Sequence, residues 1–277
     1  MKNNSLAIAL TTVVLIIYSG SLPGQKTLKV NNLLESLPNI ELEEKTPQKY
    51  LMVIDNLDYD LYGNFNRKKR VTGEYTRGLK NGYVKWNNVR VADSQKLNET
   101  FTEGEKQNHM ENFSYVASEE IVNESFFKGI AEDDLHIKTL VWDMLTFELF
   151  AWRFWNILKL NQEYSPMEMN SVIQIERLGT FENKDIRITW AGITKKNDKL
   201  CAAIKFHSMN NPLNFAIHNI EIQGRSHYWG NIYVSLSDKQ IEYGELYEDL
   251  VMDIKIIGHV TGNKVNTVRN ISIEKIL

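Results

Sequence analysis

Residues 134–160 read DLHIKTLVWDMLTFELFAWRFWNILKL, and the expected architecture of the chain follows from them. Wound as an α-helix at about 100° per residue, the segment places five polar side chains on one side, namely Thr139, Asp143, Thr146, Arg153 and Asn156. Nearly all the other residues are large and apolar. A helix that is apolar around most of its girth must be covered on several sides by other structure. We therefore expect a buried helix held by β-structure.

Charged residues within this helix exclude a membrane span and single out one position. Asp143, Glu148 and Arg153 interrupt the apolar residues too often for a helix that crosses a bilayer. Glu148 lies about 180° around the helical wheel from Thr139, among apolar side chains. An ionised carboxylate there is costly unless a cation from the sheet pairs with it; otherwise its pKa is raised. Both readings stay open, a structural ion pair or a neutral acid that touches the polar head of a ligand.

Strand-like alternation of apolar and polar residues occurs on both sides of the helix. Before it, three segments alternate, and the second and third are joined by a turn that contains Asn81-Gly82. After it, five or six strands follow one another, with turns expected at residues 195–198, 210–212 and 237–238. Gly244 lies where the apolar phase shifts, as a β-bulge would require. The expected fold class is α+β, a mostly antiparallel β meander (half-barrel or open barrel) packed around one long hydrophobic helix.

The chain is expected to divide into a leader and one β-rich domain. Lys2, an apolar run over residues 6–18 and Ser19-Gly20-Ser21 are typical of a secretory signal peptide at residues 1–21. Residues 22–49 form a polar leader or linker. Residues 50–277 form the domain, with an N-terminal β part (50–130), the central helix (131–165) and a C-terminal meander (166–277). We expect an exported protein, periplasmic or extracellular, with no permanent membrane span.

Charge and cysteine content narrow the class of protein further. The formal charge of -3 argues against a nucleic-acid binder, which usually has a basic surface. Cys201 is the single cysteine, so no disulfide forms within the chain. It alternates within a strand-like run and is expected to be a buried, inert thiol.

Two stretches and the overall plan of the chain resemble known proteins. Residues 73–86, GEYTRGLKNGYVKW, resemble one unit of a MORN-type repeat, which implies a hairpin and nothing functional, since no second copy occurs at a fixed period. Residues 226–249, with their YWG and EYGELYED elements, resemble uncharacterised bacterial exported β-rich proteins and imply no activity. The whole plan, antiparallel strands around a hydrophobic helix behind a signal peptide, is similar to periplasmic half-barrel carriers of lipids and lipoproteins. That similarity concerns architecture, which is a weak guide to function.

The common catalytic and cofactor motifs do not occur in the sequence. It has no GxSxG, HExxH, GxxxxGK[ST] or GxGxxG, and we predict no cofactor. His207, His218 and His227 lie on three successive expected strands and could converge on zinc. Their spacing is not diagnostic, however, and surface or hydrogen-bonded histidines are the more frequent case. We therefore predict no metal site.

Three functions remain. The first is an exported non-enzymatic binding or carrier protein that holds an apolar small molecule or lipid between helix and sheet, at Glu148, Trp142, Trp152 and Trp155. The second is an interaction module for an envelope protein or a glycan, built on Tyr228, Trp229 and Tyr233, although these rings could simply stabilise their hairpin. The third is a metal-assisted hydrolase. A deep apolar cavity would favour the first, exposed aromatic rings over a filled core the second, and converging histidines the third.

Overall fold

The computed structural model describes residues 47–117, 123–131, 134–175, 177–258 and 262–276. The predicted signal peptide and nearly all of the predicted leader lie outside these residues. Within the described ranges, no helix combines the length and the apolar character needed to cross a membrane.

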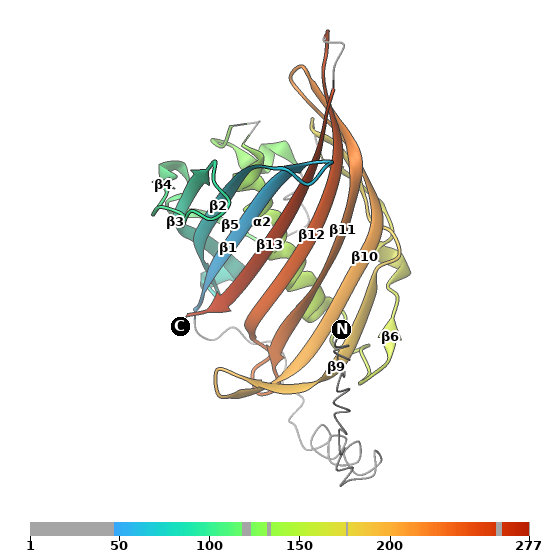
Figure 1. Ribbon diagram of the computed structural model, residues 1–277. Helices are drawn as coiled ribbons and strands as arrows, with labels where there is room; N and C mark the ends of the chain where they lie inside the picture. The colour runs from blue at the N-terminus through green and yellow to red at the C-terminus, as the bar shows by residue number, and fades with distance from the viewer. Residues whose placement is uncertain (1–46, 118–122, 132–133, 176, 259–261, 277) are drawn as a thin grey trace, which may run out of the picture. The chain divides into compact units, whose positions relative to one another are not determined.

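The described residues form one antiparallel sheet of thirteen strands (Figure 1). Its main order is β4-β3-β2-β1-β13-β12-β11-β10-β8-β7, with β5 beside β3 and with β9 pairing both β10 and β6. The two ends of this order do not pair, so the sheet is open, and its strands from β9 onward form the expected meander. The strands are β1 (Gln48–Asp60), β2 (Phe65–Arg77), β3 (Tyr83–Ser94), β4 (Glu105–Lys106), β5 (Phe113–Val116), β6 (Glu163–Tyr164), β7 (Val172–Ile175), β8 (Gly179–Glu182), β9 (Arg187–Lys196), β10 (Lys199–Ile217), β11 (Ile220–Ser235), β12 (Ile241–Ile256) and β13 (Asn263–Lys275).

The hydrophobic segment forms the expected buried helix, but the helix is shorter than predicted. It comprises the α-helix α2 (Leu135–Glu148) and the π-helical turn η5 (Leu149–Arg153). The side chain of Asp134 caps it by accepting a hydrogen bond from the Ile137 amide, at 3.4 Å. Phe154, with φ -107° and ψ 5°, leaves the helical region, and Leu160 already bridges to Trp190 of β9. The prediction of helix up to Leu160, and of a central helix over 131–165, was therefore wrong at its C-terminal end.

Short single-turn helices occupy several connections between the strands. They are η1 (Lys80–Gly82), η2 (Asn108–Met110), η4 (Glu124–Phe127) and η6 (Met167–Met169). The first closes the β2–β3 hairpin that the MORN-like stretch predicted, with Asn81 and Gly82 at positive φ. Tyr75 and Trp86 lie opposite each other across that hairpin, their ring centroids 4.9 Å apart.

The helix packs closely against β12 because Gly244 carries no side chain. A Cβ atom there would lie 2.8 Å from a ring carbon of Phe147, closer than real Cβ contacts come. Next along the helix, Phe150 stacks on Phe206 of β10, with ring centroids 4.4 Å apart. The predicted bulge at Gly244 was wrong. The register shift instead leaves Glu242 as the extra residue, two positions earlier.

The predicted turn at residues 210–212 was also wrong, whereas those at 195–198 and 237–238 are present. Strand β10 continues through this region with a bulge between Ser208 and Asn211, and the chain turns later, at His218-Asn219. The buried amide of Asn211 explains the continuity. Its Oδ1 accepts from the Lys184 amide at 2.8 Å, and its Nδ2 donates to the Ser226 carbonyl at 3.3 Å. The side chain therefore keeps the bulged strand within the sheet.

Candidate functional site

A cavity of about 450 Å³ lies between the helix and one face of the sheet. The helix contributes Trp142, Leu145, Leu149 and Phe150, and β10 and β12 contribute further apolar side chains, among them Leu213 and Leu246. Strands β7 and β8 close another side with Ile173, Ile175 and Phe181. The exposed residues Arg153, Glu168 and Ser171 also line the cavity, so it opens to solvent there.

The helix faces the cavity with the side on which the sequence predicted its polar residues. Thr139, Asp143, Thr146 and Arg153 all line it, and only Asn156 of the five polar-side residues does not. These positions recur at spacings of three, four and seven residues, which keeps them on one helical face. In a helix expected to be buried, this run of polar side chains was the signal that could have located the site.

The polar part of the wall is a buried charge cluster, Asp143–Arg269–Glu248. Arg269 donates through Nη1 to Glu248 Oε2 and through Nη2 to Asp143 Oδ2. Its Nε donates to Asn56 Oδ1 at 3.2 Å, and Ser226 Oγ donates to Glu248 Oε1 at 2.5 Å. All three charged residues of the cluster are more than nine-tenths buried.

Strand register brings this cluster together. Arg269 of β13 lies directly opposite Glu248 of β12 on one side and Asn56 of β1 on the other. Asp143 reaches the same guanidinium from α2. The cluster thus joins the first strand, the helix and the last two strands.

Burial governs the protonation of the cluster. It raises the pKa of Asp143 to about 6, and the nearby charge of Glu248 acts in the same direction while Arg269 opposes both. Burial acts to lower the pKa of Arg269, but the two carboxylates outweigh it and the net pKa lies above its ordinary value. Arg269 is therefore charged throughout the physiological range.

Thr139, Thr146 and Tyr228 present hydrogen-bond acceptors in the wall, whereas the lining residues Ser171 and Asn183 also carry donors. Thr139 Oγ1 donates to the His136 carbonyl at 3.1 Å, and Thr146 Oγ1 donates to the Trp142 carbonyl at 3.0 Å. Each hydroxyl has used its hydrogen and keeps oxygen lone pairs. Tyr228 donates its hydroxyl hydrogen to Asn183 Oδ1 at 3.0 Å, which leaves the Tyr228 oxygen as an acceptor.

Two of the seven predicted ligand-binding residues line the cavity, Trp142 from α2 and Tyr228 from β11. The other helix residues lie elsewhere. Glu148 is buried on another side of the helix, where its Oε1 accepts from the Tyr75 hydroxyl and from Arg77 Nη1, both at 2.7 Å. The ion-pair interpretation of Glu148 is therefore confirmed, with Arg77 of β2 as the cation.

Trp152 and Trp155 pack outside the cavity. The Arg77 guanidinium lies over the Trp152 ring, with its central carbon 3.9 Å from the ring centroid. The Trp152 indole N–H donates to the Lys239 carbonyl at 2.7 Å. Trp155 stacks on Trp190, with centroids 6.1 Å apart. Both rings stabilise the contact between the helix end and its surroundings.

Trp229 and Tyr233 lie on the opposite face of the sheet from Tyr228, as neighbouring or odd-spaced positions of one strand must. Trp229 pairs across the strands with Tyr247, and Tyr233 pairs with Tyr243, at centroid distances of 6.1 and 5.9 Å. These are the cross-strand pairs that stabilise a hairpin.

The three histidines do not form a metal site. His207 is exposed on β10, His218 lies in the β10–β11 turn, and His227 lies on β11. Within the described ranges, no three His, Cys, Asp or Glu side chains come close enough together to hold a metal ion. Cys201 is buried, as predicted, and burial raises its pKa to about 11.

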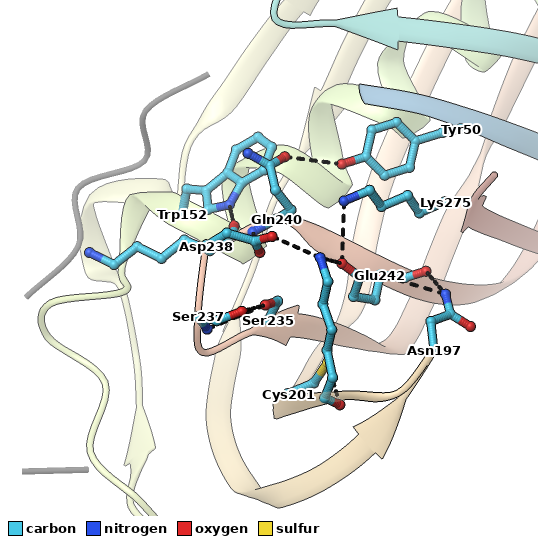
Figure 2. Close-up of polar contacts among 12 residues, drawn as sticks. Tyr50, Trp152, Asn197, Cys201, Ser235, Ser237, Asp238, Gln240, Glu242 and Lys275 are labelled. Carbon is cyan, nitrogen blue, oxygen red and sulfur yellow. Dashed lines mark hydrogen bonds and ion pairs between the residues drawn. The ribbon is translucent and has the colours of Figure 1, made fainter. Parts of the chain in front are cut away.

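A second polar cluster, centred on the buried Glu242, connects neighbouring strands away from the cavity (Figure 2). Glu242, the bulge residue, accepts from Lys199 Nζ at 2.8 Å and from Lys275 Nζ at 3.4 Å. Lys199 also donates to Asp238 Oδ2 at 2.7 Å. These contacts join β10, the β11–β12 turn and β13, and none of the residues lines the cavity. No motif or spacing in the sequence indicated this cluster.

No protein-family model and no curated protein matches the chain. A solved structure described as "lipid-protein interactions in lipovitellin" is similar, with a TM-score of 0.43 and 8% sequence identity over 85% of this chain and 25% of that one. The chain thus spans about a quarter of the length of that structure. A likeness at this level carries no information about a ligand.

Proposed function

We propose that the chain is a non-enzymatic binding or carrier protein that holds an apolar small molecule or a lipid in the cavity between α2 and the sheet. The observation that carries the proposal is the cavity itself, about 450 Å³, open to solvent and lined mainly by apolar and aromatic side chains. Sites for small molecules have this size and this lining, with a few placed polar groups.

Close packing elsewhere in the domain argues that the cavity is a built feature. Protein interiors are packed as densely as organic crystals, and an unfilled void in a core costs stability. At Gly244 the helix approaches the sheet so closely that not even a methyl group fits. On the neighbouring helix face Trp142 and Leu149 border open space instead. A bound apolar molecule would remove both surfaces from water, at about 25 cal/mol per Å² of apolar area.

Blocking the cavity tests the proposal. Leu149 is half-buried in the cavity wall, and a tryptophan there occupies ligand space. Leu200 is 47% exposed on β10 and does not line the cavity, so the same substitution there is the matched control. By isothermal calorimetry with dodecanol, we expect saturable binding to wild type and to Leu200→Trp, and at least about tenfold weaker binding to Leu149→Trp. Equal affinities for all three, or no binding to wild type, would reject the proposal.

The other two functions have less support. The aromatic rings of the β11–β12 hairpin are engaged with each other, and the histidines do not converge. Export remains a prediction that rests on Lys2, residues 6–18 and Ser19-Gly20-Ser21. If the protein is exported, protein recovered outside the cytoplasm has a mature N-terminus near Leu22. Protein found only in the cytoplasm, with Met1 intact, would exclude export.

A further inference from the structure

The Asp143 side chain has one carboxylate oxygen engaged and one available at the cavity. Its Oδ2 accepts from Arg269, and no group among the described residues donates to its Oδ1. Asp143 is 8% exposed and lines the cavity, and its Oδ1 is not sealed within the protein. A buried carboxylate oxygen without a donor is costly unless water or a ligand supplies one.

The charges around Asp143 disfavour an anionic ligand. Two carboxylates, Asp143 and Glu248, share the single guanidinium of Arg269, which leaves one net negative charge when all three groups are ionised. Arg269 therefore does not act as an anion receptor, although it borders the cavity. The two remaining charged lining residues, Arg153 and Glu168, are exposed and of opposite sign, so solvent screens them.

We propose that the ligand is an amphiphile whose polar head donates hydrogen bonds, an alcohol or an amine and not a carboxylate or phosphate, and that Asp143 Oδ1 receives this head. The proposal rests on the proposed function and specifies the ligand class. The apolar part of the ligand lies against Trp142, Leu149 and Leu246, which line the same cavity. The head replaces water at Asp143, where low local polarity strengthens a hydrogen bond to an ionised acceptor.

The hydroxyl oxygens of Thr139 and Thr146 reinforce the preference. Both threonines lie on the same helical face as Asp143 and have already donated their hydrogens to backbone carbonyls. An ammonium or hydroxyl head thus meets several acceptors on this face of the helix. A carboxylate head would meet oxygen lone pairs and a cluster of net negative charge. This repulsion disfavours carboxylate ligands relative to alcohols and amines.

Three ligands that share one alkyl chain test the proposal in the wild-type protein. Calorimetry at about pH 8 compares dodecanol, dodecylamine and dodecanoate, so that the amine is protonated, the fatty acid is ionised and Asp143 is charged. We expect the alcohol and the amine to bind at least about tenfold more tightly than the carboxylate. Dodecanoate binding as tightly as dodecanol, or more tightly, would overturn the inference and leave the proposed function standing. Binding of none of the three would instead reject the proposed function.

The Asp143→Asn variant locates the preference. It keeps the shape and removes the charge, so the ratio of amine to carboxylate affinity should fall by at least about tenfold while dodecanol still binds. Glu168→Gln, at an exposed lining position, is the matched control and should leave the ratio unchanged. An unchanged ratio in Asp143→Asn would show that Asp143 does not receive the head. If that variant does not fold, the comparison of the three ligands in wild type still decides the ligand class.

Discussion

At the scale of single residues, the charge cluster around Arg269 combines two opposing effects. Taking Asp143 and Arg269 out of water costs free energy; for Arg269 the two neighbouring carboxylates outweigh this cost, whereas for Asp143 the shared guanidinium offsets only part of it. Asp143 carries the clearest sign of this cost, because burial raises its pKa to about 6 from an ordinary value of 3.8. The protein thus holds in its cavity wall a carboxylate that the fold by itself does not favour.

The pH dependence of stability should reveal this cost. Between about pH 4 and 6 the folded protein keeps the Asp143 proton that the unfolded chain has lost, so this residue lowers the unfolding free energy as pH rises. Asp143→Asn removes the titration. We expect the wild type to lose about 3 kcal/mol relative to the variant across this window, measured by urea unfolding. The raised pKa of Asp143 would be contradicted if the difference in unfolding free energy between wild type and variant stayed constant with pH, or if it shifted in favour of wild type as pH rises.

Glu148 should behave as a structural residue. It accepts hydrogen bonds from Tyr75 and Arg77 in a buried setting, and Glu148→Gln removes the carboxylate that compensates the Arg77 charge. We expect this variant to lose about 3 kcal/mol of unfolding free energy. The control is Glu182→Gln, which loses a solvent-accessible ion pair with Lys184, 3.3 Å long, and should change by about 1 kcal/mol at most. Equal effects of the two substitutions would show that the Glu148 contacts add nothing.

At the scale of elements, the sequence predicts what depends on local pattern. The apolar character of residues 134–160 correctly predicted a buried helix, although the helix ends at Arg153, and Asn81-Gly82 correctly predicted a hairpin. The errors occurred where a tertiary contact overrides the local pattern. The amide of Asn211 holds a bulged strand in the sheet where the residue types suggested a turn, and contacts with β9 end the helix before Leu160.

The contact of the helix with β12 provides a test at this scale. Gly244→Ala places a methyl group against the Phe147 ring, which must move together with the helix. Overpacking of this kind costs about 1–3 kcal/mol, which we expect as a loss of unfolding free energy. Gly192→Ala on β9 is the matched control, since a Cβ atom there meets nothing within 4 Å. Comparable stability of Gly244→Ala and Gly192→Ala would mean that the helix does not lie against β12 as described.

At the scale of the whole described domain, the site depends on strand pairing that is distant in sequence. Strand β1 pairs with β13, which places Asn56 opposite Arg269, and Asp143 joins them from the helix. Alternation within a strand indicates which residues share a face, but it does not fix which strands are neighbours or their register. The sequence therefore singled out Glu148, which pairs with Arg77, and gave no special place to Asp143, which lines the cavity.

The position of a bound ligand tests the central claim most directly. Crystals of the protein grown with a dodecanol that carries bromine at its far end would show the bromine by anomalous diffraction. We predict one strong peak between α2 and the sheet, among Trp142, Leu149 and Leu246, with the hydroxyl at Asp143. A bromine found only on the opposite face of the sheet, beside Trp229 and Tyr247, or no bromine at saturating ligand, would contradict the claim that the cavity binds an apolar molecule.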